Sequence, residues 1–269
     1  MKRAWMVGVV VLAGVSAAGA DEFRAAGDQA WCAEERDGSR DLERYCEVRE
    51  ATVAAAGRIA VDATPNGGIS AEAWDRNEVR VLAKVSAFAE TEAEARRLVS
   101  AVTIRREGTI QADGPESERR RRAWWTVSYR LRVPARTDLD LRSMNGGIRI
   151  AGVRGHSAFE TTNGGVSVVD AGGSVQGRTT NGGVSLKLSG DRWDGDGLDV
   201  QTTNGGVTIA IPEGYNAHLE TGTVNGGIDL EFPMTVQGRI KGRFSTDLGS
   251  GGPTIRAVTT NGGVVVRRR

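Results

Sequence analysis

Few side chains in this chain have types and spacings that could support chemistry, and the densest group is a run of carboxylates. Four aspartates crowd one glycine-containing stretch: Asp191, Asp194, Asp196 and Asp199. Carboxylates on such a loop can hold Ca²⁺ through oxygen ligands. The spacing matches neither the EF-hand loop nor the calcium-binding repeat of β-rolls. A calcium site and an ordinary loop are therefore the two interpretations, and we expect no other metal and no cofactor.

The densest basic group combines arginines with aromatic residues. Its members are Arg119, Arg120, Arg121 and Arg122, followed by Trp124 and Trp125. Guanidinium forks pair well with anionic oxygens, so this group could contact lipopolysaccharide phosphate, a phospholipid headgroup or an acidic glycan. The alternative is a solvated loop beside an edge strand, where charge discourages aggregation. The arginine run at 267–269 has a similar interpretation, as a charged end to the last strand.

No set of residues in the sequence predicts a reaction. The two histidines, His156 and His218, stand at the same distance before an Asn-Gly-Gly triplet and could share one face. Asp170 and Asp229 lie at different distances from their triplets and need not share a column. No paired carboxylates, Ser-His-Asp set or metal cluster emerges from the pattern. We therefore expect isolated surface histidines and a protein that is not an enzyme.

The dominant pattern is a repeated turn that must position everything else. The triplet Asn-Gly-Gly occurs seven times, each time followed by Ile or Val. The copies begin at Asn66, Asn145, Asn163, Asn181, Asn204, Asn225 and Asn261. A hydroxyl stands two residues before every Asn: Thr64, Ser143, Thr161, Thr179, Thr202, Thr223 and Thr259. From Asn145 onward the spacings are 18, 18, 23, 21 and 36, which is typical of stacked repeats.

Each turn is followed by a short strand of alternating apolar and polar residues. The third and fifth residues after each Asn are aliphatic, as in Val166 and Val168. We predict a mainly β fold, a parallel β-solenoid, with Asn and Thr side chains hydrogen-bonded along the stack. Asn-Gly should adopt positive φ in these turns. A meander of antiparallel hairpins forming a sandwich is the structural alternative.

Residues 1–20 are expected to be a secretory signal peptide. Lys2 and Arg3 precede a short apolar run, and the small residues at 18–20 fit a cleavage site. No later segment is apolar enough to be a transmembrane helix. Without Lys2 and Arg3, the 35 basic residues fall to 33 against 34 acidic ones, which argues against a nucleic-acid partner. We expect an exported protein, periplasmic or secreted to the cell surface.

Cys32 and Cys46 are the only cysteines, and in an exported protein the simplest expectation is one disulfide. It would close an N-terminal segment over residues 21–46 and contribute roughly 3 kcal/mol in the chain-entropy model. A redox or metal pair is the alternative, but the spacing is not that of a CxxC motif.

Residues 47–137 should form N-terminal strands around one capping helix. The helix is predicted over residues 91–99, with Thr91 as N-cap and Glu94 completing a capping box. It should cover an end of the coil that otherwise exposes edge strands. Strands are predicted within 47–64, 79–87, 102–106 and 124–133.

The Asn-Gly-Gly repeats should then fill residues 138–269. The longest spacing, between Asn225 and Asn261, spans about two units. A degenerate turn, Gly251-Gly252-Pro253, lies near its middle. We therefore predict that this interval conceals one further coil.

Together these features resemble a bacterial putative-adhesin family of β-strand-repeat envelope proteins, whose domains have no known function. The resemblance covers most of residues 45–269 and implies a β-repeat fold and an adhesin-like role; it carries over no functional residues. The matching segments are Cys46-Glu47-Val48-Arg49-Glu50, Val133-Pro134, Asp138-Leu139-Asp140-Leu141 and the repeated Thr-Asn-Gly-Gly-Val units.

We predict a non-catalytic exported β-solenoid, an adhesin-like binding or structural protein of the cell envelope. Its partner would be a surface, glycan or protein ligand. One alternative is a polysaccharide-active β-helix enzyme, which a groove of clustered Asp, Arg and aromatic side chains would favour. A flat Ser/Thr/Arg face would count against that enzyme. The other alternative is an envelope accessory protein that contacts anionic lipid or lipopolysaccharide through residues 119–122.

Overall fold

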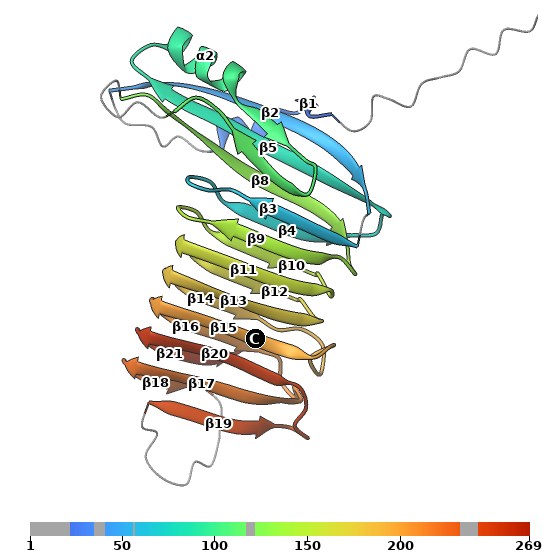
Figure 1. The fold of residues 1–269 in the computed structure, drawn as a ribbon. Helices are drawn as coiled ribbons and strands as arrows, with labels where there is room; N and C mark the ends of the chain where they lie inside the picture. The colour runs from blue at the N-terminus through green and yellow to red at the C-terminus, as the bar shows by residue number, and fades with distance from the viewer. Residues whose placement is uncertain (1–21, 35–40, 56, 117–121, 232–241) are drawn as a thin grey trace, which may run out of the picture.

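The computed structural model describes residues 22–34, 41–55, 57–116, 122–231 and 242–269, and the predicted signal peptide lies outside them. The described chain is mainly β, as predicted, with two short helices. Neither helix is long and apolar enough to cross a membrane. The strands are stacked into two sheets (Figure 1). One sheet has ten strands and the other eleven, and they enclose a core of mostly aliphatic side chains.

Each coil of the stack adds one strand to each sheet. In each of the seven repeats, the first strand ends at the Asn or a few residues before it, and the Gly-Gly turn leads into a second strand on the opposite sheet. The repeat pairs are β3 (Arg58–Asp62) with β4 (Ile69–Trp74), β9 (Asp138–Ser143) with β10 (Ile148–Ala151), β11 (His156–Asn163) with β12 (Val166–Val169), β13 (Ser174–Asn181) with β14 (Val184–Lys187), β15 (Gly197–Asn204) with β16 (Val207–Ile211), β17 (Ala217–Asn225) with β18 (Ile228–Leu230), and β20 (Thr254–Asn261) with β21 (Val264–Arg268). A further pair without an Asn-Gly-Gly triplet is β7 (Thr109–Asp113) with β8 (Trp124–Pro134).

Equivalent positions of neighbouring repeats lie side by side in parallel strands. Ile148 pairs with Val166, and Val166 with Val184. The aliphatic residues at the third and fifth positions are buried in six copies, and in the seventh Ile228 and Leu230 are half-buried. Burial of these side chains supplies the main favourable term for the stack. The hairpin meander is therefore wrong for the repeats, and the parallel pairing of equivalent strands is confirmed.

The Gly-Gly turns differ from the prediction in their backbone conformation. No Asn of the seven copies has a positive φ, and among the glycines of the triplets only Gly262 does, at 155°. The first glycine is required for a steric reason instead. A Cβ at Gly164 would lie 2.1 Å from the carbonyl oxygen of Gly146 in the neighbouring coil. The corresponding distance is 2.0–2.2 Å at Gly146, Gly182, Gly205, Gly226 and Gly262.

The seven Asn side chains form one continuous ladder. Each Nδ2 donates to the Oδ1 of the Asn before it in the stack, at 2.7–2.9 Å. The stacking order is Asn66, Asn145, Asn163, Asn181, Asn204, Asn261 and Asn225. The buried Thr hydroxyls form a second column, as in Thr179, whose Oγ1 donates to the carbonyl oxygen of Gly164 at 2.8 Å. Hydrogen bonding along the stack is therefore present as predicted, although the hydroxyls bond to glycine carbonyls.

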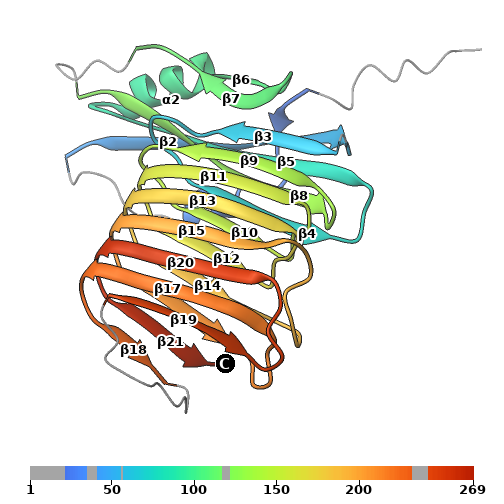
Figure 2. The same cartoon turned by 60° about the horizontal axis from the view of Figure 1, so that its bottom comes forward.

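The coils do not stack in the order of the sequence. In the ten-stranded sheet the order is β19-β17-β20-β15-β13-β11-β9-β3-β7-β6, so β20 lies between β15 and β17 (Figure 2). In the other sheet it is β1-β2-β5-β8-β4-β10-β12-β14-β16-β21-β18, so β21 lies between β16 and β18. The last coil of the chain is thereby enclosed by two others. The coil of β3 and β4 is enclosed in the same way at the other end.

The interval between Asn225 and Asn261 does not have the predicted arrangement of one concealed coil. After β18, residues 232–241 lie outside the described chain. The remainder forms β19 (Arg243–Leu248), a single strand that pairs antiparallel with β17 at the sheet edge. The chain then returns to insert β20 and β21. The stack also begins before the predicted boundary at residue 138, because β3 and β4 belong to it.

An antiparallel layer extends the N-terminal end of the stack. β1 (Arg24–Ala25), β2 (Glu43–Ala54) and β5 (Glu78–Ala89) continue the eleven-stranded sheet beyond β8, and β6 (Thr103–Arg105) pairs with β7. The helix α2 (Glu92–Ala101) contacts β5 and β2 and buries Ala95 and Val99 (Figure 1). Thr91 Oγ1 accepts a hydrogen bond from Glu94 N at 3.2 Å, which confirms the predicted N-cap.

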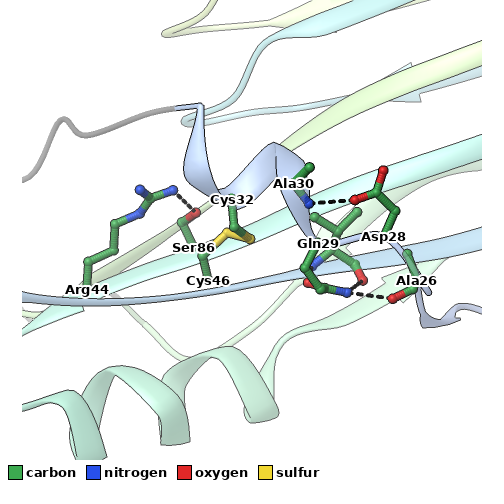
Figure 3. The surroundings of a disulfide bond; sticks show 9 residues. Ala26, Asp28, Gln29, Ala30, Cys32, Arg44, Cys46 and Ser86 are labelled. Atoms are coloured by element: carbon green, nitrogen blue, oxygen red, sulfur yellow. Dashed lines mark hydrogen bonds between the residues drawn. A yellow bond between two sulfur atoms is a disulfide. The ribbon is translucent and has the colours of Figure 1, made fainter.

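Cys32 and Cys46 form the predicted disulfide, with their Cα atoms 5.8 Å apart (Figure 3). Cys32 lies on α1 (Ala30–Ala33), a second short helix in the N-terminal segment. Gln29 bonds to both the backbone nitrogen and the carbonyl oxygen of Val48, at 2.7 and 3.0 Å. The disulfide and these bonds attach the N-terminal segment to β2.

Replacing the first glycine of a turn should be far more harmful than replacing the second. Gly164→Ala places a methyl group against the carbonyl oxygen of Gly146, whereas a Cβ at Gly165 would meet its nearest neighbour at 3.5 Å. We expect Gly164→Ala to lower the free energy of unfolding by roughly 2–4 kcal/mol, and Gly165→Ala by less than about 1 kcal/mol. Denaturant unfolding followed by circular dichroism measures both values. Equal losses would contradict close approach as the reason for the glycine.

Candidate functional site

The outer face of the ten-stranded sheet carries rows of polar and charged side chains. Since its repeat strands are parallel and in register, alternate residues line up across the coils. One row contains Asp140, Ala158, Gln176, Asp199, Arg256 and Glu220. The next row contains Asp62, Arg142, Glu160, Arg178, Gln201, Val258 and Gly222. The fold therefore gathers charges from separate repeats onto one surface.

Ion pairs connect side chains of neighbouring strands on this face. Because these side chains are largely open to solvent, each pair contributes little stability, on the order of 0–1 kcal/mol. The pairs do restrain the positions of the guanidinium groups. The shortest between repeat strands are Arg58–Asp140 at 2.9 Å, Arg178–Glu160 at 2.8 Å and Arg256–Asp199 at 2.6 Å. Arg256 also lies 3.9 Å from Glu220.

Three depressions follow one another along the same face. The first has a volume of about 470 Å³ and extends from Arg58 to Arg142. The second, of about 500 Å³, extends from Arg142 to Arg178 and Gln201. The third, of about 250 Å³, extends from Arg178 and Gln201 to Arg243. Adjacent depressions share lining residues and follow one another from Arg58 to Arg243, and we call this row of three depressions the coil groove.

The third depression is the arginine end of the coil groove. Arg178, Arg243 and Arg256 line it, and none of its described lining residues is acidic. Glu160 and Asp199 pair with Arg178 and Arg256 without lining the depression, and Arg243 has no ion-pair partner among the described residues. Guanidinium and hydroxyl groups donate hydrogen bonds, so this end suits an anionic, oxygen-rich ligand. The exposed hydroxyl-bearing lining residues are Thr180, Thr203 and Thr260. The other four lining threonines are buried, and their hydroxyls already donate to glycine carbonyls of neighbouring coils: Thr179, Thr202, Thr223 and Thr259.

A Ser-His-Asp set lies at the edge of this face, so the expectation that no such set exists was wrong. Ser245 Oγ lies 3.1 Å from His218 Nε2, and His218 Nδ1 lies 2.6 Å from Asp247 Oδ1. β19 brings Ser245 and Asp247 to His218 by pairing with β17, a contact that no repeat pattern predicts. Ser245 and Asp247 are exposed to solvent. The hydrogen bonds run in the order of a catalytic triad, but on an open edge strand.

The surroundings of His218 favour its charged form. The hydrogen bond that His218 Nδ1 donates to the carboxylate of Asp247 is the main cause that raises the pKa of His218. Its slight burial acts in the opposite direction, and the charge of Glu220, whose Oε1 lies 3.5 Å from Nε2, raises the pKa further. A histidine that holds its proton more tightly is available as a neutral general base only at higher pH.

His156 and His218 share one column, as the sequence suggested, but do not approach each other. The paired positions run His156, Ser174, Gly197, Thr254 and His218. One of the strands between the two histidines is β20, which belongs to the last coil of the chain. Asp170 Oδ1 accepts a hydrogen bond from Arg269 Nη1 at 2.7 Å, while Asp229 lies on β18. These two aspartates are not brought together.

The four aspartates of the predicted calcium loop do not converge. Asp194 Oδ2 accepts a hydrogen bond from Arg154 at 3.1 Å, and Asp199 Oδ1 accepts one from Arg256 at 2.6 Å. Within the described ranges there is no group of three or more His, Cys, Asp or Glu that could hold a metal ion. The side chain of Trp193 is buried and holds the loop in place. Its Nε1 donates a hydrogen bond to the carbonyl oxygen of Gly173, directly before β13, at 2.9 Å. This geometry favours the ordinary-loop interpretation.

The predicted basic-aromatic group is only partly described. Residues 119–121 lie outside the described chain, so their contact with an anionic partner stays a prediction. Arg122 Nη2 lies 3.6 Å from Asp41 Oδ2. Trp124 stacks on a phenylalanine of β5 with ring centroids 5.3 Å apart, and Trp125 Nε1 donates to a backbone carbonyl at 2.8 Å. Both aromatic side chains are therefore engaged within the molecule.

The residues after each Asn do not predict the coil groove. The signal lies three residues before the Asn, where successive repeats carry Arg142, Glu160 and Arg178. Opposite charges at one offset of neighbouring repeats indicate paired side chains once parallel stacking is known.

A family model described as Toastrack DUF4097 matches residues 126–267, from β8 to the last coil. The chain belongs to this family. The matched segment contains the repeats from Asn145 onward and most of the coil groove. The match agrees with the predicted resemblance to a β-rich bacterial family at the level of family and fold. No curated protein matches the chain.

Three solved structures share low similarity with the chain. A "putative cell adhesion protein" from Clostridium sporogenes is 11% identical, with a TM-score of 0.44 over 84% of this chain and 100% of its own. A "putative adhesin" from Bacteroides fragilis is 11% identical, with a TM-score of 0.31 over 86% and 98%. A "putative lipid binding protein" from Parabacteroides distasonis is 9% identical, with a TM-score of 0.28 over 86% and 98%. These values are too low to transfer a function.

Replacing Asp247 should lower the pKa of His218. In Asp247→Asn the charged acceptor is lost, so the pKa should move toward the unperturbed value of about 6.5. NMR titration of the imidazole measures the pKa in both proteins. Because the folded-state pKa is raised, the contact stabilises the fold fully below about pH 6.5 and loses this contribution as the pH rises through the folded-state value.

Ser245→Ala is the matched control for this titration, since it removes the other hydrogen-bond partner and keeps the carboxylate. Its His218 should titrate near the wild-type value. An unchanged pKa in Asp247→Asn would mean that another group holds the proton.

Proposed function

We propose that this protein is a non-catalytic β-solenoid of the cell envelope that binds an extended acidic glycan along the coil groove. The observation that carries this proposal is the row of three adjoining depressions from Arg58 to Arg243, with polar side chains contributed by successive coils. A long, open and repetitive surface suits a linear polymer, because the polymer also presents the same groups at regular intervals. An adhesin-like role would consist of this binding.

The chemistry of the groove supports a glycan over an apolar ligand. Neighbouring strands repeat their outward side chains about every 4.8 Å, so hydroxyl, amide and charged groups recur along the groove. Sugar hydroxyls can donate to the carboxylates and accept from the arginines. The arginine end adds guanidinium forks, which recognise carboxylate or sulfate groups of an acidic sugar. Many weak contacts along one polymer can together give useful avidity.

Export to an oxidising compartment is part of the proposal. The disulfide between Cys32 and Cys46 supports it, because such bonds persist outside the reducing cytosol. The basic and apolar sequence of residues 1–20 supports it independently.

The oxidised protein should bind polygalacturonate, an acidic polymer, more tightly than dextran, a neutral one. Isothermal titration calorimetry measures both affinities. The double variant Arg178→Gln/Arg256→Gln should weaken polygalacturonate binding by about tenfold or more, since each charge-assisted hydrogen bond contributes roughly 1.5–3 kcal/mol. Added salt should weaken the binding in the wild type.

Arg149→Gln is the matched control, because it removes one arginine from the opposite sheet, where Arg149 donates to Ser167. It should leave the affinity unchanged. An equal loss in the control would indicate diffuse charge attraction instead of a groove. Failure of both polymers to bind would contradict a glycan-binding function.

A serine hydrolase is the second candidate, favoured only by the geometry of Ser245, His218 and Asp247. In such a reaction Ser245 Oγ would attack an acyl carbonyl while His218 accepts its proton. The exposure of Ser245 and the raised pKa of His218 count against it. Preorganised oxyanion donors are the further requirement, and an open edge strand excludes little water.

A fluorophosphonate probe tests this second candidate, because it modifies activated serines. We expect the wild type to show no more labelling than Ser245→Ala. Labelling of the wild type that disappears in both Ser245→Ala and His218→Gln would establish the hydrolase and overturn the non-catalytic proposal.

A further inference from the structure

The Asn ladder ends at an exposed Asn-Gly pair, Asn225-Gly226. In this dipeptide the backbone nitrogen of the glycine can attack the side-chain amide, and the missing Cβ leaves the approach unhindered. We propose that Asn225 is the deamidation site of the native protein, and that the stack protects the other copies. All seven copies have the same local sequence Asn-Gly-Gly, so any difference among them comes from the fold.

The reaction needs two groups to be free. The backbone nitrogen of Gly226 forms a bond to Cγ of Asn225, the Cγ–Nδ2 bond breaks, and ammonia leaves with the proton that the backbone nitrogen gives up. Water from the solvent then adds to either carbonyl of the cyclic imide and opens it to aspartate or isoaspartate. The glycine N–H must therefore be unbound, and the Asn side chain must be able to turn toward it.

Five of the six copies inside the stack have both groups tied to the next coil, and Asn145 has one of them tied. Gly182 N donates to the carbonyl oxygen of Asn204 at 3.0 Å, and Asn181 Oδ1 accepts from Asn204 Nδ2 at 2.8 Å. The same two bonds hold four further copies: Asn66, Asn163, Asn204 and Asn261. Asn145 has the side-chain bond, which its Oδ1 accepts from Asn163 Nδ2 at 2.8 Å. Deamidation of these copies requires local opening of the stack.

Asn225 lacks both of these restraints because its coil is the outermost of the stack. Among the described residues, no donor bonds to Asn225 Oδ1 and no acceptor bonds to Gly226 N. Its side chain keeps one contact, from Nδ2 to Asn261 Oδ1 at 2.7 Å. Gly226 is exposed, whereas the first glycines of the other triplets are buried or half-buried.

The modification would change the end of the stack. An aspartate at position 225 cannot donate to Asn261 Oδ1, so two oxygens would face each other where a hydrogen bond now stands. An isoaspartate would also lengthen the backbone and disturb the register of β17 and β18 with the last coil. Deamidation would therefore loosen the outermost coil first.

The test follows all seven copies in the native full-length chain. The protein is incubated in mildly alkaline buffer made with heavy-oxygen water, digested with trypsin and sequenced by mass spectrometry. Asn204 and Asn225 fall in one tryptic peptide, from Trp193 to Arg239, so their rates are compared in the same molecule. We expect Asn225 to react at least about tenfold faster than Asn204, because two hydrogen bonds must open at the latter.

Two controls test whether the fold, and Asn225 in particular, determines where deamidation occurs. In denaturant the seven copies should react at similar rates, since their local sequences are alike. Asn225→Gln, which keeps the amide and slows ring closure, should remove most of the native-state modification. Equal rates at Asn204 and Asn225 in the folded protein, or undiminished total deamidation in Asn225→Gln, would overturn the proposal.

Discussion

The close approach of neighbouring coils at their Gly-Gly turns is the constraint on which the rest of the structure depends. The first glycine of each repeat lies so near the carbonyl oxygen of the adjacent turn that no side chain fits between them. This approach places Asn amides and Thr hydroxyls within hydrogen-bond reach of the next coil. The register of both sheets is thereby set, and a slip by one residue would exchange the buried and exposed faces.

The coils stack in an order that differs from their order in the chain, and this order protects the coils nearest the chain ends. An end coil has a neighbour on one side only, and chain ends fray most readily. Here the coils nearest the two chain ends, β3 with β4 and β20 with β21, are enclosed between others. The outermost repeat coil, β17 with β18, is instead followed by further chain. β19 lies between β18 and β20 in the chain and pairs with β17. This pairing brings Ser245 and Asp247 to His218 and places Arg243 at the arginine end of the coil groove.

The outward face of the ten-stranded sheet has the features on which the proposed binding role rests. Its carboxylates and arginines pair with one another across neighbouring coils. The coil groove draws its lining residues from successive coils. A surface of this kind can hold a polymer by many modest contacts, which is the role that we propose for it.

Short-range patterns in the sequence determined the β class, the parallel stacking, the buried aliphatic columns, the Asn ladder, the N-cap of α2 and the disulfide pair. Each follows from residues close in the chain or from equal offsets in repeats. The positive φ predicted for Asn-Gly failed because the decisive contact is with another coil. The insertion of β20, the antiparallel β19 and the coil groove were decided only by tertiary structure. Repeats with equivalent edges can pair in several orders, and the order is chosen by where the intervening chain can pack and return.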